Sequence, residues 1–362
     1  MINFFKNKSI LVTGACGTVG SELVKQLTEN EENEITGIIA IDNNESELFF
    51  SDQKYLNDGR VQFFVADVRD RDTLSKLMDG IDIVFHAAAL KHVVLCERSP
   101  DEGVQTNIHG VQNIISAANQ NNVETVIFTS SDKAVNPTNV MGTTKLMGER
   151  LMTAANSSQR SKGPVFVSTR FGNVLGSNGS VVPIFHKQIQ KGGPVTLTHM
   201  EMTRFVMSIE QAVKLVIDSA SMAQGGEVFI TKMPVITIQH LAEVMIEQLA
   251  PKYGYKIADI KISEIGTKPG EKLYEELMSD EETRRAIELP QYFSILPAFR
   301  GMYKEIAYDY RDILSDEVTN PYVSADEVVL TKEELLDFLV SNNLLRLQED
   351  IHHPDKRYWP GD

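Results

Sequence analysis

Short apolar runs rich in β-branched residues alternate with helical patterns along the first half of this 362-residue chain. Strand-like runs occupy 9–13, 36–41, 61–66, 82–86, 124–129, 165–170 and 227–230, and helical patterns between them occupy 18–30, 70–78, 100–120 and 139–155. This alternation is typical of parallel strands joined by crossover helices. Nearly continuous apolar runs such as 61–66 further indicate strands covered on both faces. The predicted fold class is therefore α/β, a doubly wound parallel sheet.

Glycines recur at every third position in the turn between the first predicted strand and the first predicted helix, giving the spacing G-x-x-G-x-x-G. Glycine lets the backbone turn tightly, approach a pyrophosphate and pack the helix closely on the sheet. The helix N-terminus then offers N–H groups to the phosphates. The turn predicts a dinucleotide-binding loop, with Cys16 as a small filler rather than a reactive thiol. The loop residues expected at the cofactor are Gly14, Cys16, Gly17, Thr18, Val19 and Gly20.

Two aspartates follow the next two predicted strands. Asp42 lies about 20 residues beyond the last glycine, where a carboxylate binds the adenosine ribose and repels a 2′-phosphate. No arginine follows it within 43–45, so the sequence favours NAD over NADP. Asp67 ends the third strand, where it either meets the adenine or caps a helix that starts near Asp70.

Composition narrows the remaining possibilities. A formal charge of −15 argues against nucleic acid or an anionic membrane as partner, and a phosphorylated substrate would need local cations. No apolar run reaches the roughly 18–20 residues of a membrane helix, and the first residues are too polar for a signal peptide. With only two cysteines, a cytoplasmic location is expected. No Cys, His or Asp cluster has metal-ligand spacing, so no metal is expected.

The alternating pattern weakens after about residue 170. Helical patterns continue at 181–191, 209–222 and 237–249. We expect a nucleotide-binding domain over 1–172, to which 205–232 returns, and a smaller substrate-binding part over 173–204 and 233–295. A C-terminal extension, 296–362, would either pack on the body or serve an oligomer interface.

Polar and ionisable residues follow the fifth predicted strand, where open α/β sheets bind their ligands. Ser131, Asp132 and Lys133 are consecutive there, and Met141 and Lys145 lie one turn apart on the next helix. The structural alternatives are a surface ion pair for Asp132 and Lys133, and a solvated helix lysine for Lys145.

In this order the motifs resemble the short-chain dehydrogenase/reductase superfamily, whose signature on this helix is Y-x-x-x-K. Within it, the chain resembles the UDP-N-acetylglucosamine 4,6-dehydratases of bacterial polysaccharide and flagellin-sugar biosynthesis. The resemblance runs from about residue 8 to about 295 and rests on the segments 88–93, 131–137, 170–174, 202–205 and 269–273. It implies an extended Rossmann fold with a smaller substrate-binding domain, NAD as cofactor, a UDP-N-acetylhexosamine as substrate, and a homo-oligomer.

Met141 departs from the superfamily pattern, because it stands where the catalytic tyrosine belongs and a thioether cannot exchange a proton. Within the resembling family, methionine at this position implies a branch that retains the configuration at sugar carbon 5. The alternatives for the function are a nucleotide-sugar 4-epimerase, which normally uses that tyrosine, the configuration-inverting dehydratase, and a protein that binds NAD without catalysis.

The resemblance also implies the roles of the catalytic residues. The reaction is an internal oxidation at carbon 4, loss of water across carbons 5 and 6, and return of the hydride to carbon 6. Lys133 is the expected base at carbon 5 and Asp132 the acid that assists loss of water. Ser131 binds the carbon-4 oxygen, and Lys145 binds the nicotinamide ribose. The acceptor of the carbon-4 hydroxyl proton is either Asp132 or a water chain to Lys145.

Further contacts are implied by the same resemblance. Lys91, Arg204 and Lys268 would neutralise the diphosphate, and Asn173 would bind the diphosphate or sugar. Lys268 replaces the family's arginine and so lacks its bidentate fork. Glu271 is expected to bind the nucleoside, to pair with Arg204, or to lie at a helix N-terminus. His86 and His92 are expected to be structural. The remaining expected contacts are Val68, Ala87 and Ala88 for the cofactor, and Ser180 and Val181 for the substrate.

Overall fold

The computed structural model describes residues 4–159, 163–177, 179–267, 270–299 and 306–346, which fall into two compact units. The first unit comprises 1–171, 212–232 and 277–321, and the second comprises 172–211, 233–276 and 322–362. These boundaries differ from the expected ones. Residues 205–211 lie in the second unit, 277–295 lie in the first, and the expected C-terminal extension is divided between the two.

One sheet of nine strands forms the centre of the described part of the first unit, in the order β14-β15-β10-β6-β5-β4-β1-β2-β3. The strands from β3 to β10 in this order are parallel, β15 pairs antiparallel with β10, and β14 pairs antiparallel with β15. The chain proceeds in one direction from β1 to β3 and in the other from β4, so the strand order reverses between β1 and β4. The predicted doubly wound sheet is confirmed. The strands are β1 (Ser9–Thr13), β2 (Gly37–Asp42), β3 (Val61–Val65), β4 (Ile83–His86), β5 (Thr125–Thr129), β6 (Val165–Arg170), β10 (Val228–Thr231), β14 (Ala286–Glu288) and β15 (Tyr292–Ile295).

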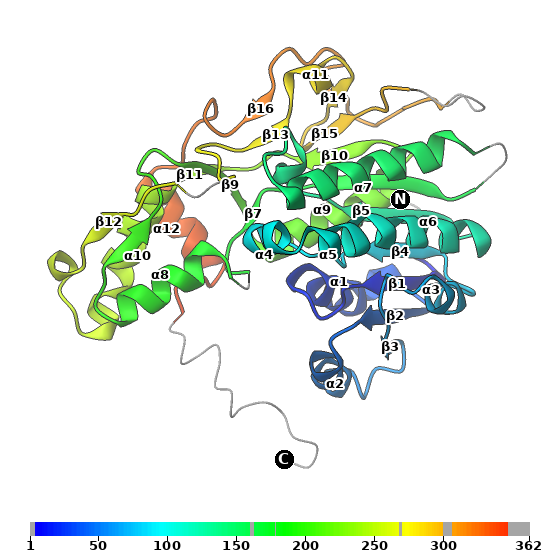
Figure 1. Cartoon of the computed structure of the whole chain (residues 1–362), viewed down its shortest axis with the longest axis horizontal. Helices are drawn as coiled ribbons and strands as arrows, with labels where there is room; N and C mark the ends of the chain where they lie inside the picture. The colour runs from blue at the N-terminus through cyan, green and yellow to red at the C-terminus, as the bar shows by residue number, and fades with distance from the viewer. Residues whose placement is uncertain (1–3, 160–162, 178, 268–269, 300–305, 347–362) are drawn as a thin grey trace. The chain divides into compact units, whose positions relative to one another are not determined.

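Helices α3, α6 and α7 pack on one face of this sheet, around a core that includes Leu74, Ile114 and Met152 (Figure 1). The predicted helix at 100–120 is interrupted by a π-helical turn at Gln105–His109. Short helices α2 and α4 form in segments for which no helix was expected. The helices of this unit are α1 (Thr18–Glu29), α2 (Glu45–Lys54), α3 (Arg71–Leu77), α4 (Val93–Arg98), α5 (Pro100–Val104), α6 (Gly110–Gln120), α7 (Val140–Ser157), most of α9 (Ile209–Met222), and α11 (Asp280–Thr283).

Strand β3 corrects one expectation. Its apolar run suggested cover on both faces, yet Phe64 and Val65 are 39% and 61% exposed. The reason is its place in the sheet, because β3 is the last strand at one edge and has a neighbour on only one side. Apolar composition therefore did not indicate burial at this strand.

The second unit has a core of its own, formed around Phe185, Leu241 and Leu335. Helix α12 comes from the expected C-terminal extension and packs on this core, with Lys332 Nζ 2.6 Å from Glu243 Oε2. At this helix the extension packs on the body. The elements here are β7 (Asn173–Val174), β9 (Thr203–Met207) and β11 (Val235–Thr237) in one sheet, β8 (Val195–Leu197) and β12 (Ile262–Glu264) in another, with α8 (Val181–Gln190), α10 (Ile238–Leu249), α12 (Lys332–Ser341) and β16 (Tyr322–Val323); β13 (Glu276–Met278) begins at its boundary.

No helix in the part of the chain that the structure describes has the length and apolarity needed to cross a membrane.

Candidate active site

The glycine turn has the geometry of a close backbone approach. Gly14 has a φ of +68°, and a Cβ there would lie 2.7 Å from the backbone of Ala88. A Cβ on Gly20 would lie 2.1 Å from the carbonyl oxygen of Gly14, so α1 can approach the turn only with glycine at this position. Gly17 is the N-cap of α1 and donates its N–H to Gly14 O at 2.9 Å. The turn thus places the N-terminus of a twelve-residue helix at the carboxyl end of β1.

A cavity of about 240 Å³ opens at the carboxyl ends of the parallel strands, beside the point where the strand order reverses. Open α/β sheets bind their ligands at such a point. This geometry fits a pyrophosphate. Gly14 and Gly20 allow the backbone to approach it closely, and the N-terminus of α1 offers N–H groups to it. Of the expected cofactor contacts, those that line the cavity are Gly14, Gly17, Asp42, Asp67, Val68, Ala87 and Ala88.

Asp42 ends β2 and braces the glycine turn, because its Oδ2 accepts the N–H of Cys16 at 3.0 Å. The thiol of Cys16 is not activated, since burial and the nearby Asp42 raise its pKa to about 11. The expected alternative for Asp67, a helix cap, is wrong because Asp70 caps α3 instead. Asp67 binds Arg69, whose hydrogen bonds hold the pKa of this carboxyl below its ordinary value. Arg69 and Glu102 also line the cavity, and sequence reasoning missed both.

Ser131, Asp132 and Lys133 form a continuous hydrogen-bonded chain beyond the end of β5. The hydroxyl of Ser131 donates to Asp132 Oδ1 at 2.6 Å, and Lys133 Nζ donates to Asp132 Oδ2 at 2.8 Å. The side chain of Asp132 is only 4% exposed, whereas that of Lys133 is 33% exposed. The pair is therefore no ordinary surface ion pair, because its carboxylate is buried while its ammonium reaches solvent.

Lys145 is buried and donates to the carbonyl oxygen of Thr129 at 2.9 Å. Burial lowers the pKa of its amino group to about 8, against the opposing effect of Glu149. The alternative of a solvated helix lysine is thereby wrong. Met141, one turn earlier on α7, is buried as well. The position of the superfamily's tyrosine thus holds a side chain that has no titratable proton.

His86 is the last residue of β4 and is fully buried, as expected of a structural histidine. Its Nδ1 lies 2.8 Å from the hydroxyl of Thr13, and its buried Nε2 has no hydrogen-bond partner within the described residues. Burial, and then the charge of Lys145, lower the pKa of His86 to about 3. The imidazole is therefore neutral at physiological pH.

Asn107 is a positioning residue that sequence reasoning missed. It is buried in the π-helical turn, and such turns often occur at functional sites. Its amide binds both the N–H and the carbonyl oxygen of Leu90, at 2.8 and 3.0 Å, and donates to Thr144 Oγ1 at 2.9 Å. It thereby joins the segment that bears Lys91 to the helix that bears Lys145. An asparagine inside an apolar helical pattern was the available signal.

In the second unit, Asn173 and Arg204 share one buried carboxylate. The amide nitrogen of Asn173 donates to both oxygens of Glu275, at 2.8 and 2.7 Å, and Arg204 Nε lies 3.3 Å from Glu275 Oε1. Arg204 also donates to the carbonyl oxygens of Thr203, Lys272 and Leu273. Glu275 was not among the expected residues, although it follows Glu271 by four positions.

Glu271 Oε1 lies 3.9 Å from Arg204 Nη2, and no helix begins at Glu271, so the helix-terminus alternative is wrong. Ser180 is the N-cap of α8, directly before Val181, and its buried hydroxyl has no partner within the described residues. Lys91 is exposed on the segment after β4. Lys268 lies outside the described residues.

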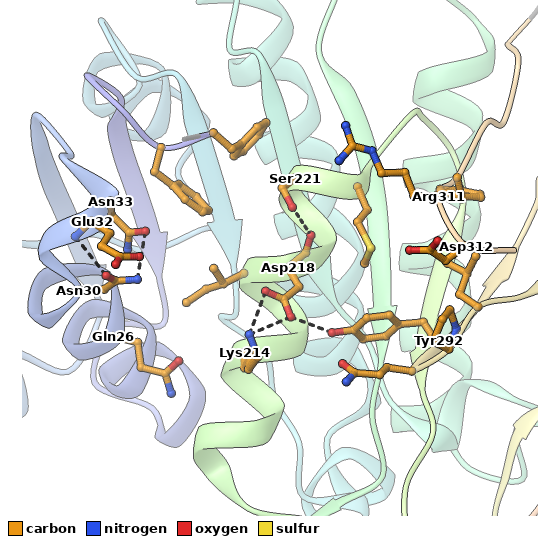
Figure 2. A pocket seen from close by; sticks show the side chains of 18 of the residues that line it. Gln26, Asn30, Glu32, Asn33, Lys214, Asp218, Ser221, Tyr292, Arg311 and Asp312 are labelled. Carbon is orange, nitrogen blue, oxygen red and sulfur yellow. Dashed lines mark hydrogen bonds and ion pairs between the residues drawn. The ribbon is translucent and has the colours of Figure 1, made fainter. Parts of the chain in front are cut away.

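A second cavity, of about 1280 Å³, lies at the amino ends of strands in the first unit's sheet (Figure 2). Its walls include residues that precede strands, such as Phe5 before β1 and Asn33 before β2. None of the expected site residues lines it. Tyr292 donates there to Asp218 Oδ2 at 2.8 Å, and Lys214 pairs with the same carboxylate. The smaller cavity, at the carboxyl ends of the strands, is lined by expected cofactor contacts, whereas Ser131, Asp132, Lys133 and Lys145 are not among its lining residues. Among the residues that the structure describes, no cluster of His, Cys, Asp or Glu could hold a metal ion.

The sequence matches a family model described as "Polysaccharide biosynthesis protein" over residues 10–297. An uncharacterized membrane protein of Methanocaldococcus jannaschii is 52% identical over 82% of this chain and 87% of its own length. The UDP-N-acetylglucosamine 4,6-dehydratase (inverting) of Campylobacter jejuni is 40% identical over 83% of this chain and 86% of its own. A UDP-glucose 4-epimerase of Rickettsia bellii is 39% identical over 96% of this chain and 99% of its own.

Among solved structures, Pen from Bacillus thuringiensis superposes with a TM-score of 0.86 at 40% identity, covering 95% of this chain and all of that one. More distant matches, at about 20% identity, support the fold alone and include nucleotide-sugar dehydratases and epimerases.

Proposed function

The chain belongs to this family of polysaccharide biosynthesis proteins, and on that premise we propose that it is an NAD-dependent nucleotide-sugar 4,6-dehydratase acting on a UDP-N-acetylhexosamine, with UDP-N-acetylglucosamine as the expected substrate. The observation that carries the proposal is the pair formed by buried Asp132 and partly exposed Lys133 at the carboxyl end of β5. Elimination of water requires an acid and a base side by side, which a simple 4-epimerisation does not.

When bound, NAD would supply the hydride acceptor for the oxidation at carbon 4 and the hydride that is returned to carbon 6. The residues that would hold it are the glycine turn at the pyrophosphate, Asp42 at the adenosine ribose, and Lys145 at the nicotinamide ribose. The backbone fit at Gly14 and Gly20 supports this placement.

The hydrogen bond between Asp132 and Lys133 supports both halves of the elimination. Transfer of one proton across this 2.8 Å contact leaves a neutral amine on Lys133 and a protonated carboxyl on Asp132. The amine then takes the proton from carbon 5, and the carboxyl gives its proton to the departing carbon-6 hydroxyl. Ser131, which donates to the same carboxylate, is the donor proposed for the carbon-4 oxygen.

The carbon-4 hydroxyl must lose its proton without a tyrosine at position 141. Of the two candidates we propose a water chain to Lys145, because burial lowers the pKa of Lys145 to about 8 and its amine is therefore partly deprotonated near neutral pH. Asp132 already accepts hydrogen bonds at both oxygens and is assigned to the elimination.

On the substrate side, we propose that Asn173 and Arg204 bind the diphosphate or the sugar, with Lys91 and Lys268 as further cations. Glu275 would hold Asn173 and Arg204 in place through its buried carboxylate. Glu271, beside Arg204, is proposed to contact the nucleoside.

The second candidate function is a 4-epimerase, because the Rickettsia relative named as one matches 96% of this chain. The stereochemistry at carbon 5 is also a matter for experiment. The Campylobacter relative is named as inverting, so the expectation of retention gains no support from it and rests on Met141 alone.

Proton NMR of the purified protein with UDP-N-acetylglucosamine in deuterated water, without added NAD, tests these proposals. A new methyl signal with deuterium at carbon 5 is the result expected for the dehydratase, and its coupling constants distinguish retention from inversion. A product that differs only at carbon 4 would establish the epimerase. An unchanged sugar, with this and other nucleotide carriers, would reject both.

A further inference from the structure

The walls of the cofactor cavity carry an excess of negative charge. Asp42, Asp67 and Glu102 contribute three carboxylates, and Arg69 contributes the single guanidinium among the lining residues, which leaves a formal charge of −2. Arg69 lies far beyond 43–45, the segment that directly follows Asp42 and contains no arginine. An arginine near the adenosine ribose is the feature by which related folds accept the 2′-phosphate of NADP. Arg69 lines the same cavity as Asp42, so a guanidinium able to bind a 2′-phosphate and a carboxylate suited to NAD are both present there.

The guanidinium of Arg69 is bound to carboxylates on two sides. Its Nε lies 3.0 Å from each oxygen of Asp67, and its Nη2 donates to Asp67 Oδ2 at 2.6 Å. Its Nη1 donates to Glu102 Oε2 at 3.0 Å. Asp67 lies two residues from Arg69 in the turn after β3, whereas Glu102 belongs to α5. The Nε and Nη2 atoms of Arg69 are thus bound by Asp67 and its Nη1 atom by Glu102, two residues from different segments of the same unit.

The contact between Asp67 and Arg69 persists at neutral pH, since its hydrogen bonds lower the pKa of Asp67 and raise that of Arg69. Both groups are therefore charged under physiological conditions. A 2′-phosphate entering the cavity would meet three carboxylates and would have to compete with two of them for the guanidinium.

We propose that Asp67 and Glu102 make the cavity selective for NAD by keeping the guanidinium of Arg69 from binding a 2′-phosphate. This inference rests on the proposed function, because it takes the cavity to be the NAD site. Glu102 is the residue that decides the outcome. Replacing it by glutamine removes the negative charge that competes for Nη1, while Asp67 still holds the guanidinium in the cavity.

The test is a double-mutant cycle on the full-length protein, stripped of bound nucleotide and titrated calorimetrically with NAD and with NADP. The four proteins are the parent, Glu102→Gln, Arg69→Met and the variant with both changes. We expect Glu102→Gln to raise the affinity for NADP relative to that for NAD about 3- to 5-fold, as fits an exposed ion pair. In the Arg69→Met background, Glu102→Gln should give no such gain.

The cycle separates release of Arg69 from simple removal of a negative charge. An equal gain in NADP affinity with and without Arg69 would overturn the proposal, as would no gain in either background. Equal affinity of the parent for both cofactors would overturn it too. If the parent bound neither cofactor, the proposed NAD dependence itself would fall, and this inference with it.

Glu124→Gln is the matched control. Glu124 forms a comparable ion pair with Lys8, at 2.6 Å, and its side chain is 52% exposed against 57% for Glu102, but it does not line the cavity. Its replacement should leave both affinities unchanged. A rise in NADP affinity here would show that any lost carboxylate produces the effect, which would contradict the role assigned to Glu102.

Discussion

The buried amino group of Lys145 donates a hydrogen bond to the carbonyl oxygen of Thr129, the last residue of β5, at 2.9 Å, and lies 4.8 Å from the centre of the Phe128 ring. This contact ties helix α7 to the strand that leads directly into Ser131, Asp132 and Lys133. The lysine proposed for the nicotinamide ribose and the pair proposed for the elimination are therefore positioned by the same strand.

Replacing Lys145 by methionine should change how stability depends on pH. The pKa of Lys145 is about 8 in the folded protein, against an ordinary value of 10.5, so between these values the unfolded chain binds more protons. Below pH 8 both states are protonated and the folded protein bears the full cost of burying the charge. As pH rises from 8 to 10.5 that cost disappears. The free energy of unfolding of the parent, relative to Lys145→Met, should rise by about 3 kcal/mol across this window.

Urea denaturation of both proteins at several pH values between 7 and 10.5 measures the difference. Subtracting the variant's curve removes the titration of all other groups that behave alike in both proteins. Parallel curves across the window would contradict a depressed pKa at this lysine.

The sequence predicted best where a local pattern determines the structure. All seven strands expected from apolar runs form, and the glycine turn, Asp42, Asp132 and Lys145 lie at the carboxyl edge of the sheet as the topology requires. Their positions follow from strand order and from contacts near in sequence, both of which a periodic pattern reveals. The roles assigned to these residues remain predictions.

Residues that act through distant partners were missed. Asn107 binds Leu90 and Thr144, Arg69 binds Glu102, and Glu275 binds Asn173 at a separation of 102 residues. Nothing in the local pattern marks such side chains, because their partners are brought near only by the tertiary fold. The exposed edge strand β3 was misjudged for a related reason, since apolar composition does not report the number of neighbouring strands.

The buried group formed by Arg170, Glu149 and Glu282 should make stability sensitive to acid. Arg170 Nη2 lies 2.6 Å from Glu149 and 2.8 Å from Glu282, and all three side chains are at most 5% exposed. Burial opposes ionisation of Glu282, yet Arg170 holds its pKa at about 2, below the ordinary 4.5. The folded state therefore binds fewer protons than the unfolded state in this range. The stabilisation is fully present above pH 4.5 and is lost as pH falls towards 2, by about 3 kcal/mol in total.

Glu282→Gln tests this dependence. Glutamine can retain the capping box with Ser279 but removes the charge, so the variant should be less stable than the parent by about 3 kcal/mol at neutral pH. The difference should shrink as the pH is lowered from 5 to 3. A constant difference in denaturation experiments would show that Glu282 does not titrate as its surroundings indicate.

Gly20→Ala should disrupt the cofactor turn. The added Cβ would lie 2.1 Å from Gly14 O, so the start of α1 must move away from the turn. We expect at least a tenfold loss of NAD affinity, on the order of what one misplaced charge-assisted hydrogen bond costs. Gly59→Ala is the control, because a Cβ there has no atom within 4 Å and should leave NAD affinity unchanged. Calorimetric titration with NAD measures both, and unchanged affinity in Gly20→Ala would remove the close approach as a requirement for binding.

Lys133→Ala should stop the reaction after the oxidation at carbon 4, because the base proposed for carbon 5 is lost while Lys145 and the cofactor turn remain. Product formation should fall about 10²- to 10⁴-fold, as is typical when a general base is removed. Addition of UDP-N-acetylglucosamine should then build up the absorbance of reduced nicotinamide, and no deuterium should enter carbon 5. Lys232→Ala is a matched control, since Lys232 forms a 2.6 Å ion pair with Glu288 and its side chain is 29% exposed, close to the 33% of Lys133. Normal turnover by Lys133→Ala would show that another group takes the carbon-5 proton. Loss of turnover without any reduced nicotinamide would place Lys133 in the oxidation step instead.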